Sequence, residues 1–257
     1  MTLDRWVPFR NESTVVCCRL FAFPHAAGSA AFYRPLRHCM PPEIDLCPIE
    51  LPGHAARLDE PPLTTMSALM DGLSHALWPL MSVPFSFFGH SVGALAAYEA
   101  ARQLRSVDGR AAVHLFVSGR ESSPSGDAPT VRPRSDLELL AILERFGSTP
   151  AAIMQRPELM AALLPALRAD LALADGYTFD AEDRLTCPIS AFGGADDVAH
   201  SGSLQSWSGR TRGRFRASIF PGGHFYFSPA PGALAKEIVQ DLRSSVSIHV
   251  DGARSRI

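Results

Sequence analysis

The sequence predicts an α/β fold built on a mostly parallel, doubly wound sheet. Short apolar runs, rich in β-branched and aromatic residues, alternate with longer stretches in which apolar residues recur at helical spacing. In addition, glycine stands beside a polar or titratable residue in the turns after three of these runs. Open α/β sheets form their sites at such carboxyl ends of strands, so these turns are candidate site positions.

Each element is assigned from its length and pattern. The short apolar runs are interpreted as strands, at residues 15–24, 44–51, 85–89, 113–118, 188–193 and 215–220. The helical patterns fall between them, at residues 66–81, 92–104, 137–146, 158–175 and 233–244.

One segment interrupts the alternation. Residues 122–183 contain no good strand but two helical patterns, which follow a loop-rich stretch. We interpret this segment as a helical lid inserted above the sheet of one domain, residues 1–257. A separate domain is the alternative, but roughly 60 residues with one-sided apolar faces would hardly hold a core alone.

The composition excludes several classes of protein. Apolar residues make up 46% of the chain and charged residues 19%, which excludes disorder for most of it. With 24 Lys and Arg against 26 Asp and Glu and no long basic run, nucleic acid is not expected as a partner. No uncharged apolar run approaches the roughly 18 residues of a membrane span, and charges interrupt the first residues where a signal peptide is apolar. We therefore expect no membrane partner and a cytoplasmic location.

The five cysteines do not form a recognisable framework. Two are adjacent, Cys17 and Cys18, inside an apolar run, and none has CxxC spacing. We expect reduced cysteines in the core and no metal site.

The motif Gly89-x-Ser91-x-Gly93 lies where a predicted strand ends and an alanine-rich helix begins. This is the context of a nucleophile elbow, in which a tight, strained turn presents a serine at a helix N-terminus. Glycines permit such a turn, and the amide of Val92 would face a developing oxyanion. The bare motif is weak, but the strand before it and the helix after it make it a strong candidate.

An elbow predicts an acid and then a histidine, each after a later strand. His224 follows residues 215–220 on flexible glycines and is the candidate general base. The adjacent Asp196 and Asp197 follow residues 188–193, and one of them is expected to orient the imidazole. Aspartate also favours turns and helix caps, which is the structural alternative for this pair. After residues 15–24, the small residues of His25-Ala26-Ala27-Gly28 would let backbone amides approach a substrate oxygen.

Three other histidines have structural interpretations. His90 lies inside the elbow motif and is expected to pack or hydrogen-bond beneath the turn. His25 is expected to shape its loop, and His54 to be a surface turn residue near the cleft.

The chain resembles the type II thioesterases that accompany nonribosomal peptide and polyketide synthases, a family of α/β-hydrolases. The resemblance covers residues 21–227, and its most discriminating piece is LRADLALADGYTF in the predicted lid. The motifs that carry it are FAFPHAAGSAAFYRPL, IELPGHAARLDEPP, FFGHSVGALAAYEAARQL, LFVSGRESSP, LPALRADLALADGYTF, FGGADD, LQSW and FPGGHFYF.

The resemblance implies a catalytic triad of Ser91, Asp197 and His224, with the amides of Ala26 and Val92 as the oxyanion hole. It also implies hydrolysis of acyl or peptidyl thioesters from the phosphopantetheine arm of carrier proteins, which would be transient partners. No cofactor or metal is implied. The alternatives are a carboxylesterase or lactonase of the same fold and, as a minor one, a non-catalytic binding module.

Two further expectations concern the predicted lid. It should select the acyl group, so that Met160→Ala would shift the chain-length preference if this side chain faces the pocket. Arg132 and Arg134 in the loop of the lid are candidates for docking a carrier, although they could equally be solvated side chains.

The sequence departs from the family pattern at three positions. Ala27 stands where the family usually has glycine, His54 where an arginine usually follows Leu-Pro-Gly, and Val198 where a proline usually follows the acid. None of these changes removes a catalytic atom, though the first two are expected to alter the cleft.

Overall fold

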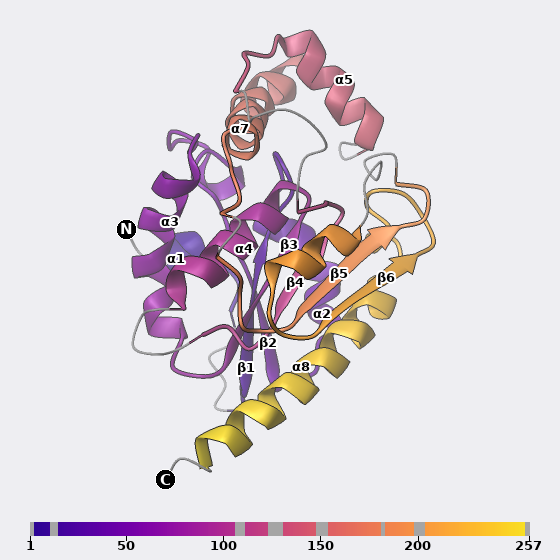
Figure 1. Ribbon diagram of the computed structural model, residues 1–257. Helices are drawn as coiled ribbons and strands as arrows, with labels where there is room; N and C mark the ends of the chain where they lie inside the picture. The colour runs from indigo at the N-terminus through magenta and orange to yellow at the C-terminus, as the bar shows by residue number, and fades with distance from the viewer. Residues whose placement is uncertain are drawn as a thin grey trace.

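The computed structural model describes residues 3–10, 15–105, 111–122, 131–147, 154–180, 183–197 and 204–254, with side chains through residue 246. Its centre is a six-stranded parallel sheet in the order β2-β1-β3-β4-β5-β6 (Figure 1). The predicted mostly parallel, doubly wound sheet is confirmed. The strands are β1 (Cys18–Phe23), β2 (Ile44–Pro48), β3 (Phe85–His90), β4 (Leu115–Ser118), β5 (Ile189–Gly194) and β6 (Phe215–Phe220).

Strands β1 to β5 are largely buried on both faces because helices cover both, whereas β6 at the edge of the sheet is only partly buried. Leu20 and Ala22 of β1 point into one apolar cluster, and Phe21 and Phe23 point into the other. This alternation follows the two-residue period of a strand. The first cluster packs under α2 (Arg34–His38) and α8 (Pro231–Arg254); the second packs under α1 (Leu3–Trp6), α3 (Met66–Leu77) and α4 (Val92–Leu104).

The strand order places the site. β1 pairs with β2 on one side and with β3 on the other, so the order of connection reverses between β1 and β3. In an open α/β sheet, a crevice opens at such a point, outside the carboxyl ends of the strands. The turn after β1 holds Ala26, and the turn after β3 holds Ser91.

The predicted helices are found with small changes at their ends. α4 has the predicted bounds, whereas α3 stops at Leu77 and continues only as a 3-10 turn, Trp78–Leu80. Pro79 explains this change, because proline has no amide hydrogen to continue the helical ladder. α8 extends beyond the predicted segment on both sides, to Arg254, and Val246 on this extension packs against the core. The other short 3-10 helices are Ala30–Tyr33, Ala55–Arg57 and Leu204–Arg210.

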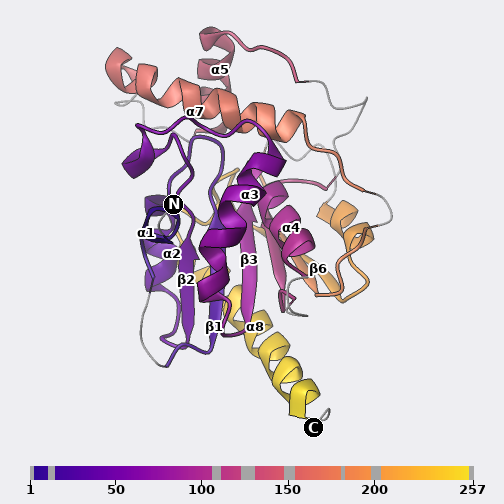
Figure 2. The same cartoon turned by 90° about the vertical axis from the view of Figure 1, so that its left-hand side faces the viewer.

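Two helices between β4 and β5 lie across the carboxyl ends of the strands, and both views show them above the sheet (Figures 1 and 2). They are α5 (Asp136–Phe146) and α7 (Pro157–Asp175), here called the helical insertion. α5 begins at a capping box formed by Ser135 and Glu138. The insertion has a small apolar cluster, against which Ala26 and Ala27 of the turn after β1 pack.

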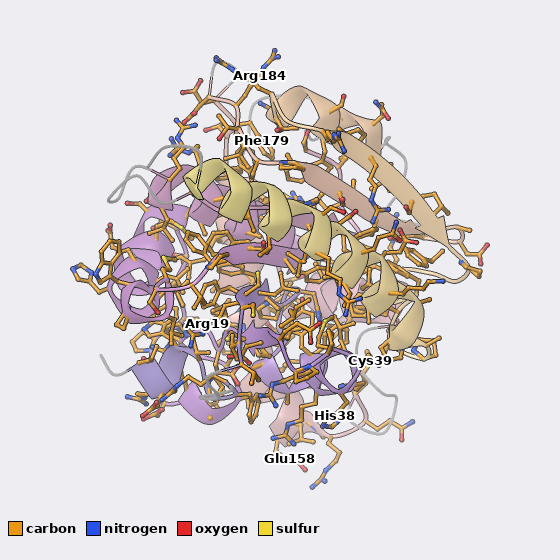
Figure 3. The ribbon with its side chains drawn as sticks, turned by 90° about the horizontal axis from the view of Figure 1, so that it is seen from below. Arg19, His38, Cys39, Glu158, Phe179 and Arg184 are labelled. Carbon is orange, nitrogen blue, oxygen red and sulfur yellow. The ribbon has the colours of Figure 1, made fainter. Side chains whose placement is uncertain are left out.

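The cysteines differ in part from the expectation. All five are free thiols; Cys18, Cys47 and Cys187 are buried, and burial raises the pKa of Cys18 and Cys187 to about 12. Cys17 and Cys39 are exposed, so the prediction that the cysteines lie in the core is wrong for these two (Figure 3 labels Cys39). β1 begins at Cys18, which leaves Cys17 just outside the sheet.

Within the described ranges, no helix combines the length and the apolar character that crossing a bilayer requires.

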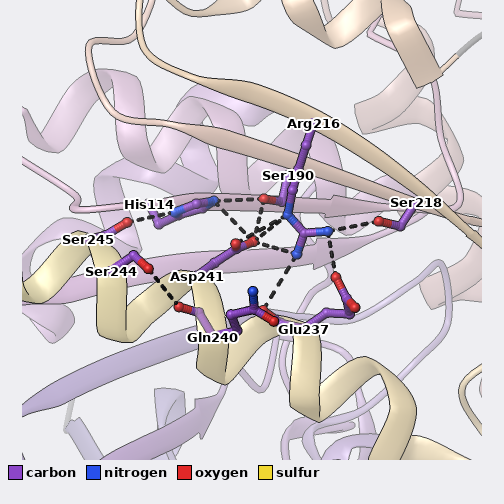
Figure 4. A network of polar contacts seen from close by, with 9 residues as sticks. All are labelled: His114, Ser190, Arg216, Ser218, Glu237, Gln240, Asp241, Ser244 and Ser245. Atoms are coloured by element: carbon purple, nitrogen blue, oxygen red, sulfur yellow. Dashed lines mark hydrogen bonds and ion pairs between the residues drawn. The ribbon is translucent and has the colours of Figure 1, made fainter.

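A partly buried polar network joins the sheet to α8 (Figure 4). His114 contacts the hydroxyls of Ser190 and Ser245, each at 2.9 Å, and Ser190 donates a hydrogen bond of 2.6 Å to Asp241. Asp241 also accepts hydrogen bonds from Arg216. Burial lowers the pKa of His114 to about 4, helped by the charge of Arg216 and opposed by that of Asp241. His114 is therefore neutral near pH 7.

The network predicts a loss of stability in acid. The unfolded chain binds the His114 proton near pH 6.5, and the folded chain only near pH 4. His114 therefore makes its full contribution to the free energy of unfolding above pH 6.5. This contribution is lost as the pH falls toward 4, and the loss between pH 7 and pH 5 is about 2 kcal/mol. Urea unfolding of His114→Gln should show a smaller decrease over this interval than the wild type.

The exposed His75 provides the control, because His75→Gln should keep the wild-type decrease. An equal pH dependence in wild type and His114→Gln would contradict this account.

Candidate active site

The turn between β3 and α4 holds Ser91 in a strained conformation. Ser91 has φ of 56° and ψ of −120°, a combination that costs about 1–3 kcal/mol for a residue with a side chain. Neighbouring backbone leaves no room for a side chain at the glycines that flank Ser91. A Cβ on Gly89 would lie 2.0 Å from the carbonyl oxygen of Gly93, and a Cβ on Gly93 would lie 2.4 Å from the carbonyl oxygen of Phe23. The Ser91 amide donates a 2.8 Å hydrogen bond to the carbonyl of Ser118. The two clashes explain why the motif has glycine at both positions.

The histidine and one aspartate are brought together as the sequence suggests. Nδ1 of His224 lies 2.8 Å from Oδ2 of Asp197, and both side chains are buried. Asp196 is exposed, and its amide donates to the carbonyl of Gly222. His224 and Ser91 line the same cavity. In the described part of the chain no residue hydrogen-bonds Nε2 of His224, so this nitrogen is available to a proton from Ser91.

Aromatic rings surround His224. Its ring centroid lies 4.8 Å from that of His90, 4.8 Å from that of Phe146 in α5 and 5.1 Å from that of Phe225. His90 also pairs through Nδ1 with the hydroxyl of Ser118 at 3.0 Å, as the structural interpretation of this residue expected. Phe146 was not predicted; its only sign in the sequence is its place at the end of an apolar helical pattern.

Gly119 is a second site residue that sequence reasoning missed. It follows β4 with φ of 64°, and a Cβ there would lie 2.6 Å from Cε1 of His90 and 3.1 Å from Cε1 of His224. The sign in the sequence was a glycine directly after a predicted strand, in Leu-Phe-Val-Ser-Gly. Only glycine leaves room for both imidazoles.

A cavity of about 300 Å³ opens above Ser91. The two candidate oxyanion residues, Ala26 and Val92, line it together with Ser91. The helical insertion supplies apolar side chains, and the loop after β4 supplies charged ones. The lining is His25, Ala26, Ser91, Val92, Gly119, Arg120, Glu121, Ile142, Leu143, Phe146, Leu167, Leu171, His224 and Phe225. The cavity can therefore hold an apolar chain next to the serine.

The Met160 side chain does not line this cavity. It is 6% exposed and packs with Leu139, Leu143, Leu164 and Leu167 inside the insertion. The expectation that Met160 would tune the pocket is therefore not supported by its position, and Leu143 and Leu171 take its place.

Two arginines proposed for docking make ion pairs within the insertion. Arg134 donates to both carboxylate oxygens of Asp175, at 2.6 and 3.1 Å, and is largely buried. Arg132 pairs with Glu138 at 2.7 Å on the surface. The side chain of Arg134 thus holds the loop before α5 to the end of α7, and a docking role for it does not fit this geometry.

His25 and His54 are both buried. His25 shapes the turn after β1 as expected: its carbonyl accepts the amide of Gly28 at 2.8 Å, and burial, with the charges of His224 and His54, lowers its pKa to about 3. The prediction of a surface position for His54 is wrong. Nε2 of His54 lies 2.9 Å from Oδ2 of Asp170 in α7, so the insertion covers this turn.

A parallel α/β sheet that presents a serine at a strained strand-to-helix turn is the arrangement of the α/β-hydrolase class. Residues 18–242 match the family model described as a thioesterase domain, and the chain belongs to this family. The gramicidin S biosynthesis protein GrsT of Aneurinibacillus migulanus is 34% identical over 244 residues, which cover 94% of this chain and 95% of GrsT.

Solved structures agree with this assignment. The type II thioesterase BorB of the borrelidin biosynthetic cluster aligns with a TM-score of 0.81 and 33% identity, over 93% of this chain and 98% of BorB. RedJ, a thioesterase of the prodiginine pathway of Streptomyces coelicolor, aligns with a TM-score of 0.79 and 31% identity, over 88% of this chain and 86% of RedJ. The prediction of a thioesterase is confirmed, and it is favoured over the alternatives of an esterase, a lactonase or a binding module.

Gly119→Ala should lower the turnover of a thioester substrate by roughly 10- to 100-fold, because the added methyl group displaces His224 from its productive position. Gly147→Ala is the control for backbone strain. Gly147 also has φ of 64°, but none of the described residues lies within 4 Å of the position that its Cβ would take. Steady-state kinetics on both variants make the comparison. Equal losses in the two would show that strain, and not the clash with the imidazoles, is responsible.

Proposed function

We propose that this protein hydrolyses acyl or peptidyl thioesters from the phosphopantetheine arm of carrier proteins, through an acyl-serine intermediate. The observation that carries the proposal is the strained Ser91 in one cavity with His224, whose Nδ1 is paired with the buried Asp197. The names of GrsT, BorB and RedJ connect those relatives with biosynthetic pathways, which supports a substrate carried on a synthase.

The proposed residues account for each step. Nε2 of His224 takes the proton from Ser91 as Oγ bonds to the thioester carbon, and Asp197 stabilises the imidazolium that forms. The amides of Ala26 and Val92 hold the oxyanion; as it collapses, the carbon–sulfur bond breaks and His224 returns the proton to the leaving thiolate. His224 then takes a proton from a water molecule as its oxygen bonds to the acyl carbon. When this second tetrahedral intermediate collapses, the bond between the acyl carbon and Oγ of Ser91 breaks, His224 returns the proton to Oγ and the carboxylic acid is released.

The lid of one hydrolase domain, predicted from the sequence at residues 122–183, is proposed to be built on the helical insertion, α5 and α7. Two contacts between the insertion and the site support this proposal. Phe146 of α5 packs on His224, and Ala26 of the turn after β1 packs against the apolar cluster of the insertion. The lid is thus proposed to select the acyl group.

Carrier proteins are the proposed partners, bound transiently, and the cytoplasm is the proposed location. A net charge of −2 gives no basic field that would attract an acidic carrier over long range. Affinity is therefore proposed to come from local docking and from threading the arm to Ser91. No cofactor is proposed.

The triad assignment predicts a ranking of variants. Ser91→Ala should lower turnover by roughly 10⁴-fold or more, since it removes covalent catalysis. Asp197→Asn should lower it by roughly 10³- to 10⁴-fold, because the imidazole loses the partner that fixes its tautomer. Asp196→Asn, the matched neighbour on the surface, should have little effect. Turnover on an acyl thioester, with mass spectrometry of the acyl-enzyme, tests this, and a reversed order of the two aspartates would overturn it.

The lid assignment predicts a change in chain-length preference. Leu143→Ala and Leu171→Ala enlarge the cavity, so the ratio of kcat/KM for long to short acyl thioesters should rise. Met160→Ala is the control: it removes a buried side chain of the same insertion without opening the cavity. An unchanged ratio in the first two variants would argue against selection by the lid.

Substrate comparison tests the function as a whole. An acyl group on a carrier protein should be hydrolysed with higher kcat/KM than the same group on a small thiol, because docking positions the arm. Both should exceed the matching oxygen ester, since a thiolate leaves without strong protonation. Equal rates for the oxygen ester and the carrier-bound thioester would replace this proposal with an esterase.

A further inference from the structure

Two of the departures from the family pattern, Ala27 and His54, meet at one carboxylate of the helical insertion. The amide of Ala27 donates a hydrogen bond of 2.7 Å to Oδ2 of Asp170, and Nε2 of His54 lies 2.9 Å from the same oxygen. Asp170 is 3% exposed and His54 is 4% exposed. Asp170 thus connects α7 with two turns that lie at the carboxyl ends of β1 and β2.

The geometry sets the protonation state of His54. Its Nδ1 lies 2.9 Å from the carbonyl oxygen of Pro52, which can only accept a hydrogen bond, and its Nε2 faces a carboxylate, which when ionised also only accepts. Both ring nitrogens therefore carry protons, and the imidazole is a cation paired with Asp170.

The surrounding charges favour this pair. Burial lowers the pKa of His54, but the hydrogen bond and charge of Asp170, the carbonyl of Pro52 and the charge of Glu50 raise it, and the net direction is upward. Glu50 itself has its pKa raised to about 7 by burial, against the Ala30 amide and the charges of His54 and Arg57. The remaining titratable neighbour, His25, is kept neutral by burial.

The hydrogen bond from the Ala27 amide to Asp170 constrains the turn after β1, which holds the proposed oxyanion amide of Ala26. Ala27 has φ of 57°, in the left-handed region that glycine adopts without cost, and no glycine relieves the strain here. The Ala27 amide belongs to the peptide group that follows Ala26, so fixing its direction also fixes Ala26, whose own amide is proposed to hold the oxyanion.

We infer that His54 and Asp170 are positioning residues of the thioesterase: they hold the turn after β1 so that the Ala26 amide points at the substrate oxygen, and they do so only while His54 is protonated. The inference rests on the proposed function of Ala26. When His54 loses one of its two protons, one ring nitrogen is left with a lone pair that faces an acceptor, either the Asp170 oxygen or the Pro52 carbonyl. That contact becomes repulsive, the ring is displaced and the turn is released.

The consequence is a loss of kcat on the alkaline side. Activity falls as His54, whose pKa is raised, becomes neutral at high pH. KM should change little, because the oxyanion exists only in the transition state.

The experiment compares pH profiles of kcat and KM for wild type, His54→Arg, His54→Gln and Asp170→Asn on one acyl thioester, corrected for spontaneous hydrolysis. Wild type should show the alkaline decrease. His54→Arg keeps a cation that does not titrate, so it should retain kcat and lose the decrease. His54→Gln and Asp170→Asn should lower kcat by roughly 10- to 100-fold at every pH, with no alkaline decrease.

Asp175→Asn is the matched control, because it makes the same substitution near the end of the same helix and breaks the ion pair with Arg134 but touches no residue of the turn. It should keep the alkaline decrease. Thermal unfolding of each variant separates loss of fold from loss of positioning, and an NMR titration of His54 in the wild type gives its pKa without any substitution.

Three results would overturn the inference: an alkaline decrease that persists in His54→Arg, a change confined to KM, or a His54 pKa that does not coincide with the decrease of wild-type kcat. Failure of the proposed function would be seen differently, as a wild type that forms no acyl adduct on Ser91 with an acyl thioester.

Discussion

The close approach of three backbone segments at Ser91 is the constraint on which the rest of the site depends. β3 can turn into α4 within one residue only because Gly89 and Gly93 lack side chains, and Gly93 also touches the backbone of β1. A strained turn of this kind persists only when its surroundings fix it. Parallel pairing of β3 with β1 and β4, and helices on both faces, provide that support. The serine is therefore presented by the core of the fold and not by a flexible loop.

The helical insertion is part of the site and not only a cover for it. Phe146 packs on the ring of His224, and Asp170 accepts a hydrogen bond from the turn after β1. Apolar side chains of α5 and α7 form much of the cavity wall. The helices that line the cavity therefore also contact the proposed general base, His224, and the turn that holds the proposed oxyanion amide.

Five histidines of this protein differ in pKa or in hydrogen-bond partner because their surroundings differ. Burial lowers the pKa of His25 and His114 and keeps them neutral, whereas a buried carboxylate raises the pKa of His54. His90 supports the turn through Ser118, and His224 is paired with Asp197. Residue type alone therefore says little about the role of a histidine, while its hydrogen-bond partners say a great deal.

The sequence by itself determined the parallel α/β sheet, the strand-to-helix turn at Ser91, the turns after later strands that carry the aspartate pair and His224, and the helices α5 and α7, because local patterns of apolar residues and glycine encode all of these. It left open which aspartate faces the imidazole, since Asp196 and Asp197 are neighbours, and only the packed turn shows one buried and one exposed. It misplaced His54 and missed Gly119 and Phe146. Their environments are made by segments far apart in the chain: Asp170 lies 116 residues after His54. Such contacts leave no periodicity in a single sequence, so only the tertiary structure could decide them.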